Sequence, residues 1–226
     1  MKKGNKRKKS YNNLIKTILV FLCYFLYSQA FTSLFGSSVA VNFIADIIFL
    51  IAIVLAYKEN LKRAFKNLKK EYSLGKIIKT ILLWFVIILV FNMVMGMLTD
   101  VLAPNATLDD NSQAVQNLFQ ISTLYTIFKT MIFAIVAEEL LFRESVHDVV
   151  SNKWLFILVS SLIYTLANFA YTGFDDHFLV ISLLSYFLPA LLFSYAYCKN
   201  HNNILVLMMI KFVYQLIPLT LTFLLK

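Results

Sequence analysis

The chain has 226 residues, of which 60% are hydrophobic and only 15% are charged. A typical soluble domain carries about 25% charged residues, so this composition excludes a soluble globular domain, a disordered chain and a disulfide scaffold. Two cysteines are too few for a zinc site built from thiolates. The formal net charge is +9, and the distribution of the basic residues along the chain decides what that charge means.

Apolar runs long enough to form helices follow one another along the whole chain. A helix spans the hydrocarbon core of a bilayer with about 20 mostly apolar residues, and continuously apolar runs argue against the alternating strands of a β-barrel. We therefore predict an all-α, polytopic membrane helix bundle with about seven transmembrane helices. The runs lie at about 14–35, 38–57, 76–98, 121–142, 154–171, 178–198 and 203–225.

The first apolar run follows a basic stretch at 1–9 and has features of a secretory signal peptide. Ser28-Gln29-Ala30 even offers a weak cleavage pattern of small residues. Because the run is long enough to cross a bilayer, we interpret it as an uncleaved transmembrane helix.

The basic residues predict the orientation of the bundle. Of the 21 Lys and Arg residues, 18 fall in segments 1–16 and 58–79 or at Arg143, Lys153 and Lys199, which all belong to one side of a seven-helix topology. This asymmetry follows the positive-inside rule and predicts a cytoplasmic N-terminus and an outside C-terminus. It also explains the net charge without a nucleic-acid partner. The opposite links carry acidic residues instead, namely Asp100, Asp109, Asp110, Asp175 and Asp176.

The link between the second and third runs has the pattern of a basic amphipathic helix. Leu61, Phe65, Leu68 and Tyr72 recur at helical spacing, with lysines on the other faces. We expect this helix to connect two spans along the anionic inner leaflet of the membrane, so that membrane lipids are partners, in preference to a docking site for a protein. Residues 1–75 thus form an N-terminal addition of two helices and a basic link, and residues 76–226 form a five-helix core.

Ionisable residues inside the spans each require an explanation, because one costs about 2.5–3.5 kcal/mol to insert. Asp46 is alone in its span, and pairing or a wet groove explains it as well as a function does. Lys129 lies near the outer end of its span, where it can reach the interface by snorkelling. Lys211 is deeper, about 12 Å along its helix from the boundary.

Glu138 and Glu139, with Arg143 four residues further on, form the strongest functional candidate. Glu139 and Arg143 share a helix face, whereas Glu138 is rotated by about 100°. The arginine can therefore hold one carboxylate while the other stays available to polarise water. A polar helix end with a local ion pair is the structural alternative.

The segment Glu138-Glu139-Leu140-Leu141-Phe142-Arg143 has the form EExxxR. It resembles the first motif of the CPBP family of intramembrane proteases (CAAX-protease and bacteriocin-processing, also called Abi). The family's other motifs are FxxxH and HxxxN. Segments 160–168 and 199–215 resemble the regions of these motifs in order, so that the resemblance covers about 121–225 and implies an intramembrane metalloendopeptidase.

The chain departs from this family pattern at its histidines. Tyr164 and Asn168 stand where the second motif has Phe and His, and Lys211 and Gln215 stand where the third has His and Asn. An amide is a poor zinc ligand and an ammonium is repelled by the metal, so we predict no metal or other cofactor; zinc is expected only if the protease is active. We expect Lys211 to pair with Glu138 or Glu139. The positions that match the family's catalytic motifs are Glu138, Glu139, Arg143, Asn168, Lys211 and Gln215.

Three functions remain open on these residues. The favoured one is a non-catalytic member acting as a membrane regulator, scaffold or bacteriocin-immunity-type protein, with another membrane protein or peptide as partner. The alternative is an active CAAX-type endopeptidase that uses Glu138 or Glu139. A transporter or channel is disfavoured because the chain has few intramembrane charges and no Gly-rich discontinuous helices. The low Gly count and the many Lys, Asn, Ile and Phe residues indicate an AT-rich bacterial source, so we expect a multi-pass protein of a bacterial cell membrane.

Overall fold

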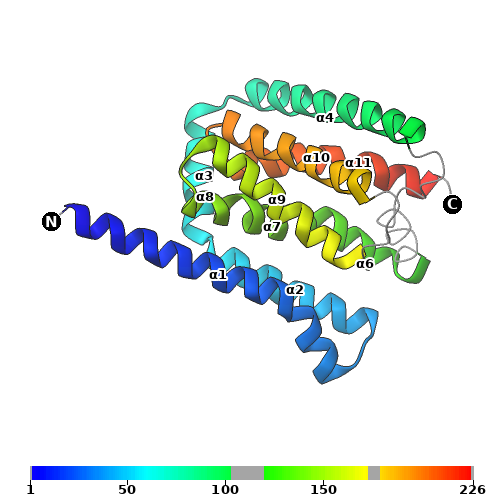
Figure 1. Cartoon of the computed structure of the whole chain (residues 1–226), viewed down its shortest axis with the longest axis horizontal. Helices are drawn as coiled ribbons and strands as arrows, with labels where there is room; N and C mark the ends of the chain where they lie inside the picture. The colour runs from blue at the N-terminus through cyan, green and yellow to red at the C-terminus, as the bar shows by residue number, and fades with distance from the viewer. Residues whose placement is uncertain (1, 103–119, 173–178, 225–226) are drawn as a thin grey trace.

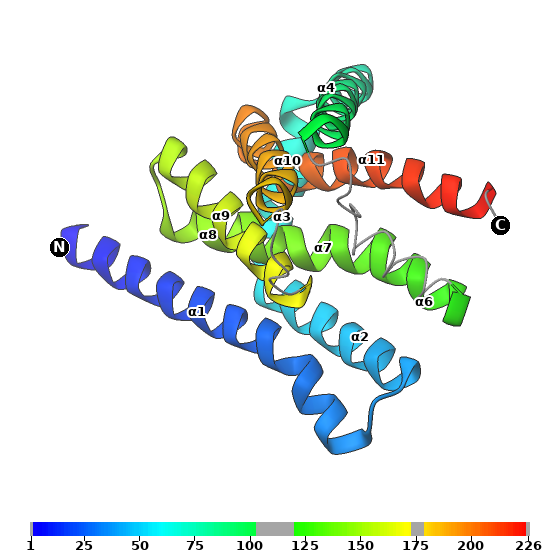
Figure 2. The same ribbon diagram turned by 45° about the vertical axis from the view of Figure 1, so that its right-hand side comes forward.

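The N-terminal residues form an antiparallel helical hairpin (Figures 1 and 2). The computed structural model describes residues 2–102, 120–172 and 179–224. Helix α1 (Lys2–Phe35) ends at Gly36, whose φ of 81° lies in the left-handed region that favours glycine. Helix α2 (Val39–Ala56) then begins behind Ser38, whose hydroxyl accepts a hydrogen bond from the Val41 amide at 3.2 Å.

Two helices connect this hairpin to the rest of the bundle. Helix α3 (Lys58–Glu71) is short and runs across the ends of the long helices, whereas α4 (Leu74–Leu102) runs alongside α10 and α11 (Figure 1). The amide of Asn203 ties α3 to the start of α11 by donating to the Ala64 carbonyl at 3.0 Å.

The fourth apolar run is a helix that changes its pitch twice. Helix α6 (Thr123–Phe128) leads into a π-helical turn, η1 (Lys129–Phe133), and α7 (Ala134–Glu139) leads into a second one, η2 (Leu140–Glu144), before α8 (Ser145–Val149). In η2 the Ser145 amide bonds to Leu140, so the Leu141 carbonyl accepts the Ser145 hydroxyl instead. Nothing in the apolar pattern indicated these two turns.

The last three helices complete the bundle around α7. Helix α9 (Lys153–Thr172) packs along α10 (Leu179–Lys199), and α11 (Ile204–Leu224) contacts α3, α4 and α7. Buried serines allow α9 and α10 to approach closely: Ser160 and Ser161 each lie 3.2 Å from the Ser194 hydroxyl. Small residues at such contacts are typical of helix pairs in membranes.

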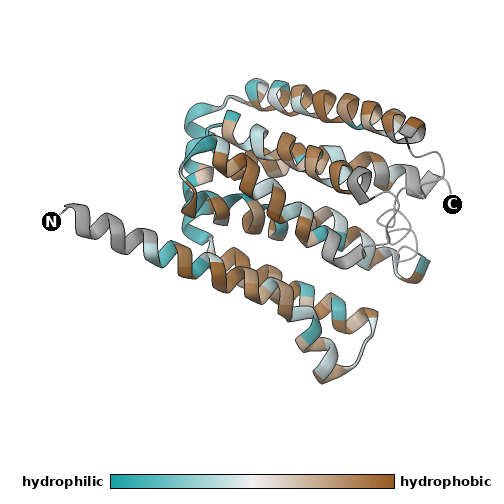
Figure 3. Ribbon diagram, viewed as in Figure 1, coloured by the Kyte–Doolittle hydropathy of each residue, from teal (hydrophilic) through white to brown (hydrophobic). Residues whose placement is uncertain are grey.

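Hydrophilic residues gather at one end of the bundle, where α3 lies (Figure 3). We call this the basic end. It is formed by α3, by the link between α8 and α9, and by the turn between α10 and α11. Its basic residues include Lys58, Lys62, Arg63, Lys66, Lys69, Lys70, Lys153 and Lys199. The predicted acidic residues Asp109, Asp110, Asp175 and Asp176 of the opposite links lie outside the described residues.

Apolar side chains cover the outside of the bundle, as a lipid environment requires. Within the described residues, three helical segments are long and apolar enough to cross a membrane: Tyr11–Phe35, Val39–Ala56 and Leu74–Leu98. Shorter apolar helices lie at Lys153–Asn168 and Ile204–Ile217. The prediction of an all-α membrane bundle is confirmed, and the chain is a multi-pass membrane protein. Seven spans and their orientation stay predictions.

The predicted amphipathic link is helical, but its apolar side packs mainly on the protein. Leu68 and Tyr72 are buried and Leu61 is half-buried in the core, and only Phe65 of the predicted stripe is exposed. Much of the apolar surface of α3 is therefore covered by the bundle, while its lysines stay outside.

Candidate functional site

The two adjacent glutamates lie at the end of α7, between the two π-helical turns. Each π turn shifts the register of the helix, so residues on either side of α7 do not follow ideal α-helical spacing. Glu139 is fully buried, and the side chain of Glu138 is 16% exposed. Such turns occur often at functional sites, which makes this segment the natural place to look for one.

Lys211 of α11 reaches both glutamates. Its Nζ lies 2.7 Å from Glu139 Oε1 and 3.3 Å from Glu138 Oε2, and it also donates to the Ala134 carbonyl at 2.9 Å. These three acceptors match the three donors of an ammonium group. Lys211 is 4% exposed, so it does not snorkel, and the predicted pairing with the glutamates is present in the structure.

Arg143 supports the site from the other side of Glu139. Its Nε lies 3.4 Å from Glu139 Oε2, close enough for an ion pair, although neither atom forms a hydrogen bond. The guanidinium carbon lies 4.7 Å from the centroid of the Tyr164 ring, and Lys211 Nζ lies 5.6 Å from the same centroid. Tyr164 thus places an aromatic face beside both cations, which stabilises their charge.

The expected division of labour between the glutamates is wrong. Ideal helix geometry predicted that Arg143 holds Glu139 while Glu138 points elsewhere and stays available. Lys211 instead contacts both carboxylates, because its long side chain enters between them from α11. The sequence predicted the partner correctly but not that one ammonium would engage both acids.

In the described parts of the chain, the two amide residues of the predicted site form no hydrogen bond to Glu138 or Glu139. Asn168 donates from Nδ2 to the Tyr164 carbonyl of its own helix at 2.8 Å. Gln215 lies one turn beyond Lys211 on α11, and its Oε1 is buried without a hydrogen-bond partner. The cluster that the structure assembles is therefore Glu138, Glu139, Arg143 and Lys211, with Tyr164 beside it.

The donor set does not fit a zinc ion. Zinc requires neutral imidazoles, thiolates or free carboxylates, whereas both carboxylates here contact an ammonium group. His147 packs edge-on against the rings of Phe156 and Tyr197 at 5.4 and 5.5 Å, and His201 is exposed in a turn. Over the described parts of the chain, no group of three or more His, Cys, Asp or Glu side chains is placed to hold a metal.

A family model covers the segment that contains this cluster. Residues 120–217 match the model described as type II CAAX prenyl endopeptidase Rce1-like. This domain belongs to the CPBP family. The match confirms the resemblance seen at EExxxR. No curated protein and no solved structure matches the chain.

A second buried polar cluster joins the N-terminal hairpin to the CPBP domain. Asp46 of α2 accepts hydrogen bonds from Lys129 Nζ at 2.8 Å and from the Tyr125 hydroxyl at 2.8 Å, and also from Tyr27 of α1. The expectation that Lys129 snorkels to the interface is therefore wrong, because Asp46 lies within its reach. Asp46 and Lys129 lie at similar distances from the starts of their helices, which is the one signal in the sequence that could have suggested the pair.

A third polar cluster lies at the basic end and begins at Glu144, the residue that follows Arg143. Glu144 accepts hydrogen bonds from Asn60 of α3 at 2.7 Å and from the Tyr197 hydroxyl at 2.8 Å. Asn60 also donates to Asp148 at 3.2 Å. Sequence reasoning missed this cluster because Glu144 follows the motif without belonging to it. The cluster ties α3 and α10 to the helix that carries the site.

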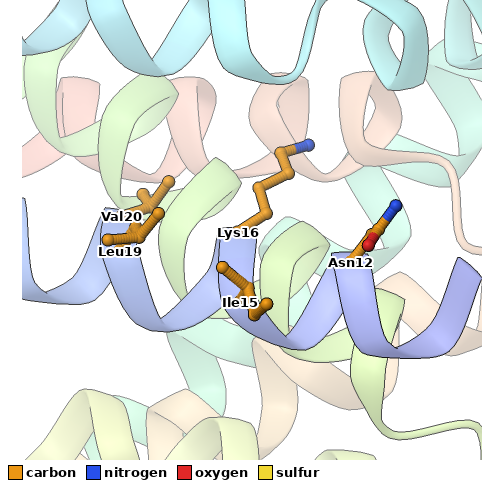
Figure 4. A pocket seen from close by; sticks show the side chains of 5 residues that line it. All are labelled: Asn12, Ile15, Lys16, Leu19 and Val20. Carbon is orange, nitrogen blue, oxygen red and sulfur yellow. The ribbon is translucent and has the colours of Figure 1, made fainter. Parts of the chain in front are cut away.

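A cavity beside α1 lies away from the glutamates. It has a volume of about 370 Å³ and is lined by residues of α1 alone (Figure 4). Lys16 extends from α1 at this place, and its Nζ lies 3.4 Å from the centroid of the Tyr57 ring. A hollow beside a single helix, without acidic or nucleophilic side chains, offers no chemistry. Its lining residues are Asn12, Ile15, Lys16, Leu19 and Val20.

Proposed function

We propose that this protein is a non-catalytic member of the CPBP family that acts as a regulator or scaffold for another membrane protein or peptide. The observation that carries the proposal is the position of Lys211 Nζ, 2.7 Å from Glu139 and 3.3 Å from Glu138. The ammonium supplies the positive charge that a metal would otherwise bring to the two carboxylates. A role of the bacteriocin-immunity type belongs to this proposal, as does the cell membrane of a bacterium as its location.

The pairing of both glutamates with Lys211 supports the loss of proteolytic activity. A carboxylate that activates water must be free to take a proton from it, but both glutamates are occupied by Lys211. The two histidines that the family motifs would supply are replaced by Asn168 and Lys211, and neither side chain is a substitute for imidazole. The hydrogen bonds from Lys211 to both glutamates link α7 and α11 instead.

The competing function is an active intramembrane endopeptidase of the CAAX type. The partial exposure of Glu138 is the feature that favours it. It requires a neutral Lys211, and a neutral amine would leave Glu138 without a counter-charge and Glu139 with Arg143 alone. We therefore prefer the non-catalytic function.

Peptide cleavage by the purified protein in liposomes separates the two functions. Farnesylated peptides with CAAX-type ends are suitable substrates because the matched family model is that of CAAX prenyl endopeptidases. We expect no release of the terminal tripeptide above the level of a Glu139→Gln variant. Cleavage by the wild-type protein that Glu139→Gln abolishes would overturn the proposal.

A further inference from the structure

The two tryptophans of the chain lie on either side of one tyrosine at the basic end. Trp84 of α4 approaches the Tyr195 ring of α10 edge-on, with centroids 5.9 Å apart. Trp154 of α9 stacks on the same ring, with centroids 6.4 Å apart and an angle of 18° between the planes. Three helices that are distant in sequence therefore contribute to one aromatic cluster.

Two lysines extend over this aromatic cluster. Lys153 Nζ lies 5.2 Å from the centroids of both Trp154 and Tyr195, and Lys199 Nζ lies 5.6 Å from that of Tyr195. Since both distances end at the same ring, the two ammonium groups are at most about 11 Å apart. Neither lysine forms an ion pair with any described residue. We call these five residues the aromatic clamp: Trp84, Lys153, Trp154, Tyr195 and Lys199.

Lys153 and Lys199 place the clamp at the basic end, where the apolar helices meet hydrophilic residues. Tryptophan and tyrosine concentrate at membrane interfaces, and lysines there attract anionic lipids. Trp84 is 7% exposed, whereas Trp154 is 69% exposed. Trp84 is thus packed inside the bundle, whereas Trp154 lies on its outer surface. The ammonium groups of Lys153 and Lys199 are therefore accessible from outside the bundle.

A row of exposed leucines runs from the clamp along α9. Leu158, Leu162 and Leu166 follow Trp154 at steps of four residues, so they share one face of the helix. Each is about half exposed. The row from residue 154 to 166 is about 18 Å long at the rise of an α-helix, which is comparable to an extended acyl chain.

We propose that the aromatic clamp binds the phosphate headgroup of an anionic membrane lipid, with an acyl chain lying along the leucine row of α9. Two ammonium groups without an ion-pair partner among the described residues favour a headgroup with net negative charge over a zwitterionic one. The leucine row starts at Trp154 and leads into the apolar surface, which favours a lipid over a soluble phosphate. This site is independent of the glutamate cluster and of whether the protein cleaves peptides.

Tryptophan fluorescence reports on the clamp because both tryptophans belong to it. The full-length chain is placed in phosphatidylcholine nanodiscs that contain dibrominated phosphatidylglycerol or, for comparison, dibrominated phosphatidylcholine as the quencher. We expect the anionic lipid to quench at a several-fold lower mole fraction. A Trp84→Phe variant leaves Trp154 as the only emitter, and the wild-type chain gives the same comparison if that variant folds poorly.

Changing the lysines tests the headgroup contact. A basic residue near the membrane surface contributes about fivefold to anionic-lipid affinity, so Lys153→Gln with Lys199→Gln should lower the selectivity by about that factor for each lysine. Lys66→Gln with Lys69→Gln on α3 removes the same charge from the same end and should keep the selectivity.

Three results would overturn the proposal. Equal quenching by both brominated lipids would mean that ordinary surrounding lipid covers the clamp. Equal loss of selectivity in the α3 control would assign the effect to the general charge of the basic end. Relief of quenching by millimolar glycerol phosphate, at constant ionic strength, would identify the clamp as a site for a soluble phosphate.

Discussion

Lys211 is a charged residue in an apolar helix that is stable there because its three donors all have acceptors. A buried ammonium without partners costs several kcal/mol, and the cost is offset only when geometry and hydrogen bonds are complete. The contacts with Glu138, Glu139 and the Ala134 carbonyl meet that condition. Removing Lys211 would leave two acids in the bundle without their main counter-charge.

We therefore predict that Lys211→Met lowers the free energy of unfolding by about 3–5 kcal/mol, the usual cost of removing one member of a buried ion pair. Thermal unfolding in detergent measures the effect. Glu139→Gln in the Lys211→Met background should restore part of the loss, because a neutral amide needs no counter-charge. The coupling energy from this double-mutant cycle isolates the interaction, and a silent Lys211→Met change would refute the ion pair.

Glu144 predicts a dependence of stability on pH. Burial raises the pKa of Glu144 above its ordinary value of 4.5, outweighing the hydrogen bonds from Asn60 and Tyr197, which lower it. The folded state therefore keeps this proton more readily than the unfolded chain does. Ionisation of Glu144 therefore lowers the free energy of unfolding. This loss of stability is absent below pH 4.5, grows as the pH rises towards the raised pKa and is constant above it.

The Glu144→Gln variant separates this effect from other titrations. Because glutamine does not titrate, the variant should gain melting temperature relative to the wild-type protein as the pH rises from about 4 to 7. The substitution also removes one carboxylate oxygen that accepts a hydrogen bond, and this shifts the melting temperature by an amount that does not change with pH. A difference between the two melting temperatures that stays constant over this range would contradict the raised pKa.

Helix α2 is joined to the site helix by a polar contact in addition to apolar packing. Asp46 accepts hydrogen bonds from donors on α1, α6 and η1, so one carboxylate connects the N-terminal hairpin to the CPBP domain. Around it, Phe49 packs against Tyr27 and Phe133 with ring centroids 4.7 and 6.0 Å apart. The hairpin is thereby positioned next to the segment that leads to the glutamates.

Lys129→Met should destabilise the protein by about 1–3 kcal/mol, because it strands the buried carboxylate of Asp46. The cost should be smaller than for Lys211, since the Lys129 side chain is 34% exposed and its charge is partly solvated. Adding Asp46→Asn should recover stability, and chemical unfolding in mixed micelles is a suitable measurement. If Lys129→Met has no effect, or if the second change adds to the loss, the pair does not join the two parts.

At the scale of the elements, the sequence predicted most helices to within a few residues. The apolar run at 38–57 corresponds to Val39–Ala56, and the one at 203–225 corresponds to Ile204–Leu224. The bounds agree because a continuous run of apolar residues marks the length of a membrane helix. The π turns were not predictable, since they preserve the composition of the helix and change only its register. The ion pair between Glu139 and Arg143, predicted from their spacing of four residues, is nevertheless present at 3.4 Å.

The whole molecule has one basic end, and its apolar helices run away from it. The sequence predicted this polarity from the positions of lysine and arginine, and the structure gathers α3, Lys153 and Lys199 at the same end. The contacts among Asp46, Tyr27 and Tyr125 could not be predicted because they depend on how three separate helices rotate about their axes. The order of basic residues along the chain is enough to predict the basic end, whereas the pairing of side chains from different helices depends on how those helices pack.

The same polarity predicts the orientation in the membrane. With the basic end in the cytoplasm, a reporter that is active only outside should give a signal when it is fused to the C-terminus. A reporter that fluoresces only in the cytoplasm should give one at the N-terminus. A cytoplasmic C-terminus would rule out seven spans, since an odd number places the two ends on opposite sides.

The most direct test of the central claim, that Lys211 takes the place of a metal at Glu138 and Glu139, is the zinc content of the purified full-length protein. Elemental analysis after purification in buffer with added zinc and removal of unbound metal gives the stoichiometry. We predict far less than one zinc per chain, unchanged in a Glu138→Gln variant. One zinc per chain in the wild-type protein, lost in that variant, would contradict the claim and favour an active metalloendopeptidase.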